Sequence, residues 1–557
     1  MIGYYITEEL IATSEGKICR EPPYLDFLLG DNSDGIKIFY DLDANVASLL
    51  RLIGITEAEG KKLRDQEQLY LGPYKLTYFP GVFFGIDFRG IDFHGNVFQP
   101  LGGKSYYNTT LVNNASLTWM QKGTDANFSG ANQYIDTHFA PDNSPEYAIA
   151  KAKEAQKVGL EAQQAFAYLG LPTDKLTSPI AAFKKQLETL DIPDYLTMPD
   201  EASVWAYDAM KGNLVQAFQM GYWPQAFDYD INASYPYELS KLLDLRRGRW
   251  VKRKHPLEQA AYGFAQGIIT TNAKFHPFLY RKGAGMIYTP VGQWETCLTL
   301  QEYDFLYDYK LGEFEATGGW WLWLPTEPDY RLYEGVVRWL YDKREGTTGL
   351  TRLVIRRISA ALWGKLSETR RGEPGPHFQP CYAAAVEANA RIRLAKTCLD
   401  YGVEHILHTA VDGFISDKKL PLKTSQELGD WRLTGEGRCL ISGTGVVAFE
   451  GHDGAGDFSL RFDWLNDQIK AHPRAKSYTM EKHSVIGLGL ALATDFSYLG
   501  KVARKPRSVK VGEDTKRFWP ERPKNGGQLL SGRKWISEPL EYSLIAGLGV
   551  DKVNETR

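Results

Sequence analysis

The sequence predicts a chain of α/β (α+β) class that divides into two or more domains. Its 557 residues exceed the usual size of one domain. An apolar content of 43% and an aromatic content of 13% suffice for packed cores and argue against disorder. Segments of helical composition alternate with short apolar runs bounded by Gly, Asn or Asp, which is the pattern of mixed helix and sheet.

The N-terminal part of the chain is expected to be rich in strands, because short apolar runs broken by Gly, Asn and Asp recur there, at 35–42, 74–79 and 81–88. The segment 145–168 is rich in Ala, Lys, Glu and Gln and favours one long helix. A second helix is expected over 203–219, and strand signal returns at 226–232.

The second half is expected to open with a helical hairpin. Residues 331–343 and 349–366 favour helices, separated by the turn-forming stretch EGTTG. An Ala-rich helix at 382–401 leads into EHILHTAVDGFIS (404–416), where the Asp-Gly pair at 412–413 interrupts strand signal as in a hairpin. The tail beyond residue 500 is basic and rich in Pro and Gly.

Charge is balanced overall but not locally. The net charge is −3, yet residues 501–534 hold eleven Lys/Arg against three Asp/Glu, and residues 338–371 hold nine against three. Such runs are usually solvated faces, but two of them with interleaved aromatic residues also suit a polyanionic partner.

The chain has the composition of a protein from a reducing compartment. Its five cysteines form no CxxC pair, so neither a disulfide framework nor a zinc site is expected. The N-terminus lacks the pattern of a signal peptide, and no apolar run reaches transmembrane length. We therefore expect a cytoplasmic protein without a membrane partner.

Two segments place carboxylates where strands end. FDYDINASYP (227–236) contains Asp228 and Asp230, and Asp412 lies in a strand–turn–strand segment. Two carboxylates on neighbouring strands can bridge two Mg²⁺ ions, which clamp the attacking and leaving oxygens of a phosphoryl transfer. Each segment alone has an ordinary explanation, a surface strand or a hairpin turn, but their joint order favours the metal site.

The helix expected over 349–366 carries a stripe that is a poor core face. At 3.6 residues per turn, the stripe consists of Arg352, Arg356, Ala360 and Trp363. Arginines neutralise phosphates through bidentate contacts, and an indole can stack on a base. The stripe therefore suits a nucleoside triphosphate.

These segments resemble the three motifs of family B DNA polymerases, most closely the protein-primed phage branch. DINASYPYEL (230–239) resembles motif A, D-x-x-S-L-Y-P; RRISAALWGKL (356–366) resembles motif B, K-x-x-x-N-S-x-Y-G; HTAVDGF (408–414) resembles motif C, Y-x-D-T-D-S. TSPIAAFKK (177–185) and LGDW (428–431) also resemble that branch. The resemblance covers most of the chain. It implies a right-hand polymerase, with palm, fingers and thumb, after a ribonuclease-H-like exonuclease-type domain.

The resemblance implies roles for individual residues. Asp230 and Asp412 would be the catalytic acids, and Asp228 an accessory or surface acid. The Mg²⁺ ligands (Mn²⁺ being an alternative ion) would be Asp230, Ile231 and Asp412. Tyr235 would lie under the incoming sugar and exclude a 2′-hydroxyl. The other nucleotide-binding residues would be Arg344, Arg352, Arg356 and Trp363, and the DNA-binding residues Lys476, Tyr478, Arg504, Lys505 and Arg507.

Several positions depart from the family pattern. Ala410 replaces the first acid of D-T-D, and Ala360 and Ala361 replace Asn-Ser of motif B. Arg356 keeps the charge of the motif B lysine but is a poor proton donor. The lysine-x-tyrosine motif should fall at Gly443–Gly445, where it is absent, although KSY (476–478) follows downstream. These departures predict a slower polymerase or one with altered chemistry.

The N-terminal domain resembles an exonuclease that has lost its acids. FYDLDANVASLL (39–50) resembles the second exonuclease motif, N-x-x-x-D, with Asp41 and Asn45 exchanged. In YAIAK (147–151), Lys151 replaces the acid of the third motif, and no D-x-E marks the first. Because a site without carboxylates binds Mg²⁺ poorly, we expect no proofreading.

The resemblance divides the chain into six parts: an exonuclease-like domain (1–200), palm with motif A (201–250), an insertion between motifs A and B (251–330), fingers (331–375), palm with motif C (376–480), and thumb with a basic C-terminal region (481–557). The stretch from Gly364 to Asp412 is short and already includes the helix expected over 382–401. It leaves little room for the second insertion of the protein-primed branch, between motifs B and C.

The function that follows is DNA-directed DNA polymerisation for a phage or another mobile element. Its partners would be primer–template DNA and deoxynucleoside triphosphates, with a terminal protein or other replication proteins as further candidates. Two alternatives stay open: a primase-like or template-independent nucleotidyltransferase, and an inactive nucleic-acid-binding relative. Primer extension with and without template separates the three.

Overall fold

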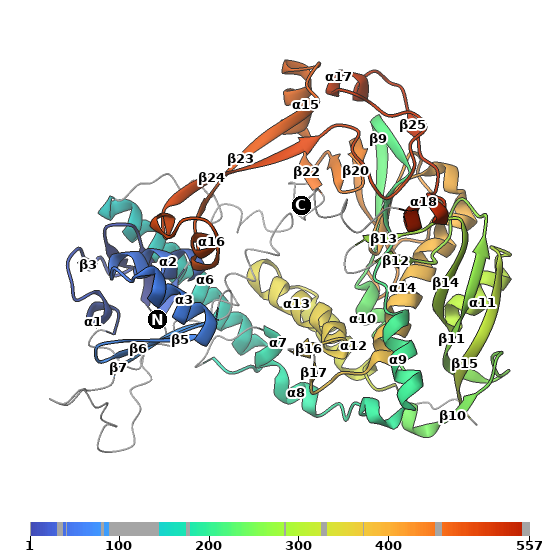
Figure 1. Cartoon of the computed structure of the whole chain (residues 1–557), viewed down its shortest axis with the longest axis horizontal. Helices are drawn as coiled ribbons and strands as arrows, with labels where there is room; N and C mark the ends of the chain where they lie inside the picture. Colours follow the sequence, from blue (N-terminus) through green and yellow to red (C-terminus); the bar gives the residue numbers. More distant parts are fainter. Residues whose placement is uncertain are drawn as a thin grey trace. The chain divides into compact units, whose positions relative to one another are not determined.

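The computed structural model describes residues 2–29, 37–39, 42–79, 83–88, 144–173, 179–282, 286–324, 331–370, 373–451 and 459–547. They belong to two compact units (Figure 1). The first comprises Met1–Lys185, Gly346–Arg357 and Thr479–Arg507, and the second Gln186–Glu345, Ile358–Tyr478 and Ser508–Arg557.

The first unit contains a mixed four-stranded sheet with the order β3-β2-β1-β4. Strand β1 (Ile2–Ile6) pairs antiparallel with β2 (Ile11–Thr13) and parallel with β4 (Lys37–Phe39), and β3 (Ile18–Cys19) pairs with β2. Helix α6 (Pro145–Tyr168) packs against β1 and confirms the single long helix predicted there. Gly3 permits this close packing, because a Cβ at Gly3 would lie 1.8 Å from the Ala152 carbonyl oxygen.

Helices that the sequence analysis missed complete the core of the first unit. They are α1 (Tyr24–Leu29), α2 (Leu42–Leu52) and α3 (Glu57–Gln66), and they precede the sheet of β5 (Gln68–Leu71), β6 (Tyr74–Phe79) and β7 (Phe83–Phe88). A capping box of Thr56 and Glu59 starts α3. Helix α16 (Leu488–Ala493) packs on α3, so part of the region expected to be the thumb belongs to this core.

The second unit is built on an eight-stranded sheet. Its order is β22-β21-β20-β9-β19-β18-β8, with β25 (Trp535–Ile536) also paired to β9. The central strands are β20 (Trp431–Gly443), β9 (Gln219–Ile231), β19 (Gly413–Ser416) and β18 (Ile406–Ala410), and the outer ones β22 (Ser459–Arg461), β21 (Val446–Phe449) and β8 (Val215–Ala217).

The helix predicted over 203–219 is wrong in its second half. Helix α9 spans Asp200–Ala209, and Val215–Ala217 form strand β8. Gly212 separates them with φ +93°, a left-handed conformation that no helix interior accepts. The strand forms because its backbone groups pair with β18, a partner that local composition does not reveal.

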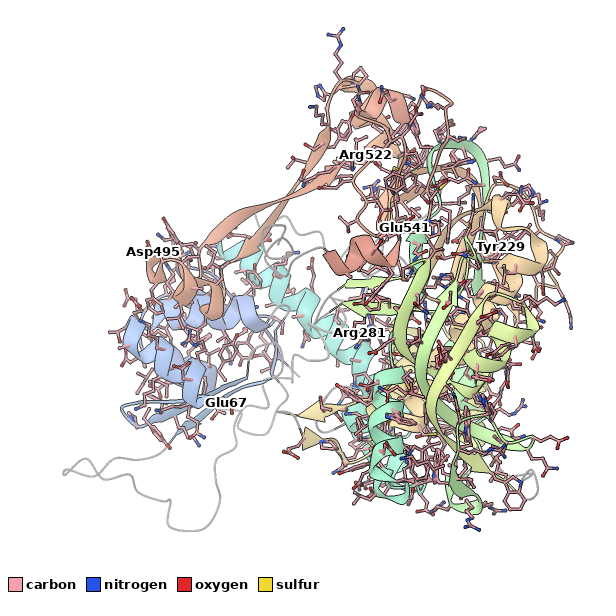
Figure 2. All side chains as sticks on the ribbon, turned by 45° about the vertical axis from the view of Figure 1, so that its right-hand side comes forward. Glu67, Tyr229, Arg281, Asp495, Arg522 and Glu541 are labelled. Carbon is pink, nitrogen blue, oxygen red and sulfur yellow. The ribbon has the colours of Figure 1, made fainter. Side chains whose placement is uncertain are left out.

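The segment expected as an insertion shares the core of the second unit. It forms a sheet with the order β10-β15-β11-β14, whose strands are Arg249–Lys252, Glu313–Trp323, Ala260–Thr271 and Gly292–Thr299. Helix α11 (Leu300–Asp308) lies between β14 and β15 along the chain, and the hairpin of β12 (Tyr280–Lys282) and β13 (Met286–Tyr288) lies between β11 and β14. Trp294 and Trp321 belong to one buried cluster with Tyr229 and Phe414 of the main sheet. Figure 2 shows Tyr229 among the side chains of this unit. The segment is therefore not a separate module.

The two helices predicted on either side of the EGTTG turn are confirmed as α12 (Glu334–Arg344) and α13 (Gly349–Leu366), and the predicted Ala-rich helix as α14 (Pro380–Tyr401). Between α13 and α14 the chain forms a minimal hairpin of β16 (Thr369–Arg370) and β17 (Glu373–Pro374). This short connection is as compact as the sequence spacing predicts. Among the described residues, no helix has the length and apolar character needed to cross a membrane.

Candidate active site

The two motif acids lie next to each other, Asp230 on β9 and Asp412 in the turn that precedes β19. Strands β9 and β19 are antiparallel, with Gly413 opposite Asp230. The backbone N–H of Ile231 donates to the carbonyl oxygen of Asp412 at 3.0 Å. Gly413 is required for this approach, because a Cβ there would lie 2.6 Å from the carbonyl oxygen of Tyr229. Two acids that are far apart in the sequence are thus held side by side by the main chain.

Asp412 sits in a tight turn between β18 and β19. Its backbone N–H donates to the Ala410 carbonyl at 2.8 Å, and Val411 adopts φ +62°. A β-branched residue in the left-handed region is strained, and such strain gathers at functional sites. The turn therefore fixes Asp412 at a cost in backbone energy.

Strand alternation separates the acids of β9 from the core. Phe227, Tyr229 and Ile231 point into the buried cluster, so Asp228 and Asp230 share the opposite face. The carboxylate of Asp228 accepts a hydrogen bond from the Thr434 hydroxyl at 2.7 Å. This local partner fits the accessory role predicted for Asp228.

Arg432 is a site residue that the sequence analysis missed. It lies on β20 opposite Asp230, and its guanidinium donates to the Asp230 carboxylate at 3.1 Å. Both side chains are about one-third exposed, at 31% and 34%. No sequence signal marks Arg432, because its position depends on the register of β20 against β9.

The donor set fits Mg²⁺. Asp230 and Asp412 offer carboxylate oxygens, whereas the Ile231 side chain is a hydrocarbon without a donor atom, so Ile231 could contribute only its main-chain carbonyl oxygen. Among the described residues, no group of three or more His, Cys, Asp or Glu is arranged to hold a metal. Two carboxylates nonetheless suffice for an ion that completes its shell with water and substrate phosphates.

Tyr235 and Trp363 form an aromatic pair in the same unit as the acids. Tyr235 lies on α10 (Ser234–Leu239), and its ring stacks on that of Trp363 with centroids 5.1 Å apart and 19° between planes. The Tyr235 hydroxyl donates to Asn213, and the Trp363 indole N–H donates to the Ala383 carbonyl at 3.2 Å. Burial, and then the charge of Glu387, raises the pKa of Tyr235, so its hydroxyl stays protonated. The sequence predicted both rings but not Asn213.

The predicted arginines lie on the helical hairpin. Arg344 ends α12, with its guanidinium 4.7 Å from the ring centroid of Tyr341. On α13, Arg352 donates to the Thr347 carbonyl at 3.4 Å, and Arg356 is exposed. Trp363 and Arg344 belong to the second unit with the acids, whereas Arg352 and Arg356 belong to the first. The predicted stripe is partly exposed along its length, as a phosphate-binding face requires.

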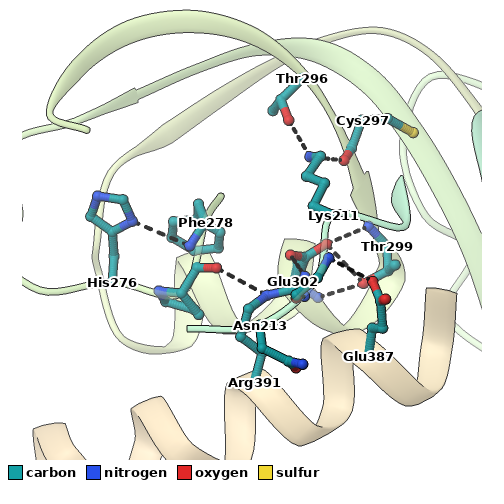
Figure 3. A network of polar contacts seen from close by, with 12 residues as sticks. Lys211, Asn213, His276, Phe278, Thr296, Cys297, Thr299, Glu302, Glu387 and Arg391 are labelled. Carbon is teal, nitrogen blue, oxygen red and sulfur yellow. Dashed lines mark hydrogen bonds and ion pairs between the residues drawn. The ribbon is translucent and has the colours of Figure 1, made fainter. Parts of the chain in front are cut away.

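A network of buried charges adjoins Asn213 (Figure 3). Arg391 of α14 is fully buried and pairs with buried Glu302 at 2.6 Å. The burial of Glu302 would raise its pKa, but the charges of Arg391 and Lys211 outweigh that effect and lower it. Burial lowers the pKa of Lys211, which donates to the Thr296 hydroxyl and the Cys297 carbonyl.

Comparison with known proteins identifies the fold. No protein-family model and no curated protein matches the chain. Among solved structures, Phi29 DNA polymerase with primer–template DNA matches with a TM-score of 0.58 at 12% identity, covering 92% of this chain and 99% of that chain. Its ternary complex with incoming nucleotides gives the same values, and its orthorhombic crystal form gives 0.56 at 11% identity over the same coverage.

The chain has the fold of Phi29 DNA polymerase. Because that enzyme is a protein-primed family B polymerase, the predicted resemblance is confirmed at the level of the fold. The match extends over nearly the whole of both chains, so it is not limited to the sheet that carries the acids. The roles of single residues stay predictions.

The predicted DNA contacts are only partly at the surface of this polymerase fold. Lys476 is exposed before β23 (Ser477–Val485). Tyr478 is a correction: its side chain is 3% exposed and its hydroxyl donates to the His472 carbonyl at 2.9 Å, so it packs inside. Strand β24 (Val502–Lys510) carries Arg504, Lys505 and Arg507, whose side chains lie outside the described residues.

The predicted exonuclease positions have structural partners. Asn45 is buried on α2 and accepts a hydrogen bond from the Ile6 backbone at 2.7 Å. Lys151 on α6 pairs with Glu154 at 2.9 Å. Strand β1 contains no carboxylate, and the missing first motif stays a prediction. Asp41 lies outside the described residues, as does the side chain of Asp43.

Proposed function

We propose that the chain is a DNA polymerase that adds deoxynucleotides to the 3′-hydroxyl of a primer–template. The observation that carries the proposal is that Asp230 on β9 and Asp412 in the turn before β19 are held next to each other by the main chain, within a fold shared with Phi29 DNA polymerase. Structures of that enzyme hold primer–template DNA and incoming nucleotides, which supports the same partners here.

The reaction joins the primer 3′-oxygen to the α-phosphorus of a deoxynucleoside triphosphate and releases pyrophosphate, while the hydroxyl proton passes to solvent. Asp230 and Asp412 would hold Mg²⁺, which supplies charge stabilisation for the transferred phosphoryl group. The stacked pair of Tyr235 and Trp363 would contact the incoming sugar and base. Arg344, which belongs to the same unit as the acids, would supply positive charge to the triphosphate.

Proofreading is absent from the proposed activity. Lys151 occupies the place of an acid and is paired with Glu154, and β1 has no acid to offer. A scaffold with too few carboxylates, and with Lys151 in place of one of them, would not hold the Mg²⁺ that hydrolysis of a primer end requires. We place the enzyme in the replication of a phage or other mobile element, in the cytoplasm, with a terminal protein as a candidate partner.

The test is primer extension by Asp230→Asn and Asp412→Asn variants. Both should lose nucleotide addition by more than about 100-fold, since even groups that only orient metal ligands contribute about 10- to 100-fold. Asp467→Asn is the matched control, because Asp467 is an exposed acid on α15 (Phe462–Ala471) of the same unit. Retained activity in Asp412→Asn, with DNA binding intact, would contradict the proposal.

One observation favours a template-independent variant of the same chemistry. Ala360 lies exposed on α13, one turn from Trp363, where the family has larger polar side chains. A small residue there makes fewer contacts with a template base pair. Omitting the template from the same assay decides between the two: extension of a single-stranded primer at an undiminished rate would establish the alternative.

A further inference from the structure

The Tyr235 side chain is held by two contacts, one through its ring and one through its hydroxyl. Its ring stacks on Trp363, and its hydroxyl donates to the side-chain oxygen of Asn213. Stacking alone lets one ring slide over the other at little cost in energy. A hydrogen bond from the hydroxyl also fixes the orientation and the position of the Tyr235 ring. Asn213 therefore determines the position of the hydroxyl-bearing edge of the Tyr235 ring.

Asn213 is in turn positioned by its neighbour Gly212. The Gly212 backbone N–H donates to the Glu387 carboxylate at 2.9 Å, and its carbonyl accepts from the Arg391 guanidinium. Gly212 has φ +93°, and a Cβ there would lie 3.3 Å from the Ile287 side chain. Both polar groups of Gly212 are thus clamped by two charged residues of α14.

The clamp is itself rigid, because each of the three guanidinium nitrogens of Arg391 donates a hydrogen bond. The guanidinium also donates to the Pro277 carbonyl at 3.1 Å and to Glu302 at 2.6 Å, and the Arg391 side chain is 0% exposed (Figure 3). A buried ion pair adds little net stability, but it tolerates only one geometry. The network is therefore better explained as a positioning device than as a source of stability.

We propose that Asn213 is a positioning residue for Tyr235 and sets how strictly the enzyme excludes ribonucleotides, with Glu387 and Arg391 fixing Asn213. The inference rests on the proposed polymerase function, in which the ring of Tyr235 collides with a 2′-hydroxyl. A Tyr235 ring that is free to move makes a weaker steric clash with a 2′-hydroxyl. Loss of the hydrogen bond to Asn213 should therefore weaken the selection against ribonucleotides, although the ring is still present.

The size of the effect follows from one hydrogen bond. Removing Asn213 should reduce the discrimination between deoxynucleotide and ribonucleotide, expressed as the ratio of kcat/KM values, by about 2- to 12-fold. Tyr235→Phe removes the other partner of the same bond and should have an effect of the same size. Tyr235→Val, which removes the ring, should reduce discrimination far more.

The experiment measures that ratio for single-nucleotide insertion by Asn213→Ala, Asn213→Asp, Tyr235→Phe and the Asn213→Ala/Tyr235→Phe double variant. Asp keeps an oxygen acceptor, so Asn213→Asp should retain the parental ratio. The double variant should match the single variants, because both remove one bond. Gln225→Ala is the control: Gln225 is exposed on β9 and its amide bonds Glu436 at 3.0 Å.

A folding defect would lower both insertion rates and the thermal midpoint, but it would not select between sugars. An unchanged ratio in Asn213→Ala, or additive losses in the double variant, would overturn the inference while leaving the polymerase proposal intact. A parental enzyme that inserts no nucleotide at all would overturn both.

Discussion

Replacing Arg432 by Gln should lower the Mg²⁺ concentration that half-maximal primer extension requires. The Arg432 guanidinium donates to the Asp230 carboxylate at 3.1 Å, on the face that Asp228 and Asp230 share. A metal ion approaching Asp230 has to displace or share that cation. Without the guanidinium, the carboxylate is available to the ion from the start, so binding should need less Mg²⁺.

The magnitude follows from the exposure of the pair. Arg432 and Asp230 are 31% and 34% exposed, so water screens their attraction substantially. Pairs of this kind contribute about 0.2–1 kcal/mol, and each 1.36 kcal/mol is a factor of about ten. The Mg²⁺ requirement of Arg432→Gln should therefore fall by about 1.4- to 5-fold. The difference should shrink as salt rises, because ions screen exposed pairs.

The assay is a Mg²⁺ titration of initial extension rates at two ionic strengths. Arg438→Gln is the matched control, because Arg438 lies on the same strand β20 and pairs with Glu450 at 2.6 Å instead of a site acid. Its Mg²⁺ requirement should equal the parental one. A higher requirement in Arg432→Gln would refute the reasoning and show that Arg432 assists the metal site, for instance by orienting Asp230.

Three further predictions follow from the site and from the N-terminal unit. Tyr235→Val should raise ribonucleotide insertion relative to deoxynucleotide insertion, measured with both substrates on one primer; an unchanged ratio would count against the exclusion of a 2′-hydroxyl by Tyr235. A labelled primer with a 3′ mismatch should stay intact with Mg²⁺ and no nucleotides, and degradation abolished by mutating Asp41 or Asp43 would show that the N-terminal unit is an active exonuclease. Because the β16–β17 hairpin is minimal, strand displacement should be weak and primer–template should be released more readily as salt rises; products many circle lengths long in rolling-circle extension with trap DNA, without a helicase, would contradict this.

The sequence predicted those parts of the site that depend on residue type and local order. Asp230, Asp412, Tyr235 and Trp363 were named from motifs, and the structure brings the two acids together and stacks the two rings. Local composition likewise predicted the long helices α6, α13 and α14 within a few positions of their ends, because length and periodicity decide helices.

What the sequence did not show depends on pairing between distant segments. Arg432 faces Asp230 only through the register of β20, and Asn213 reaches Tyr235 only because Gly212 is clamped by α14. The strand β8 was mistaken for helix for the same reason, since its partner β18 follows much later in the chain. Tyr478 matched a motif by its letters, yet its packing against Gly526 places it in the interior.

Ala410, which stands where the resembled motif C has its first acid, is compatible with this architecture because the main chain positions Asp412. Ala410 ends β18, opposite Val215 of β8, and its contribution to the turn is the carbonyl that accepts the Asp412 N–H. That contribution is independent of the side chain, so alanine supplies it as well as aspartate would. Asp412 is then fixed from the other side by the Ile231 N–H and by the close approach that Gly413 allows. Gly413→Ala would disturb this backbone. It should therefore displace Asp412 more than the alanine at position 410 does.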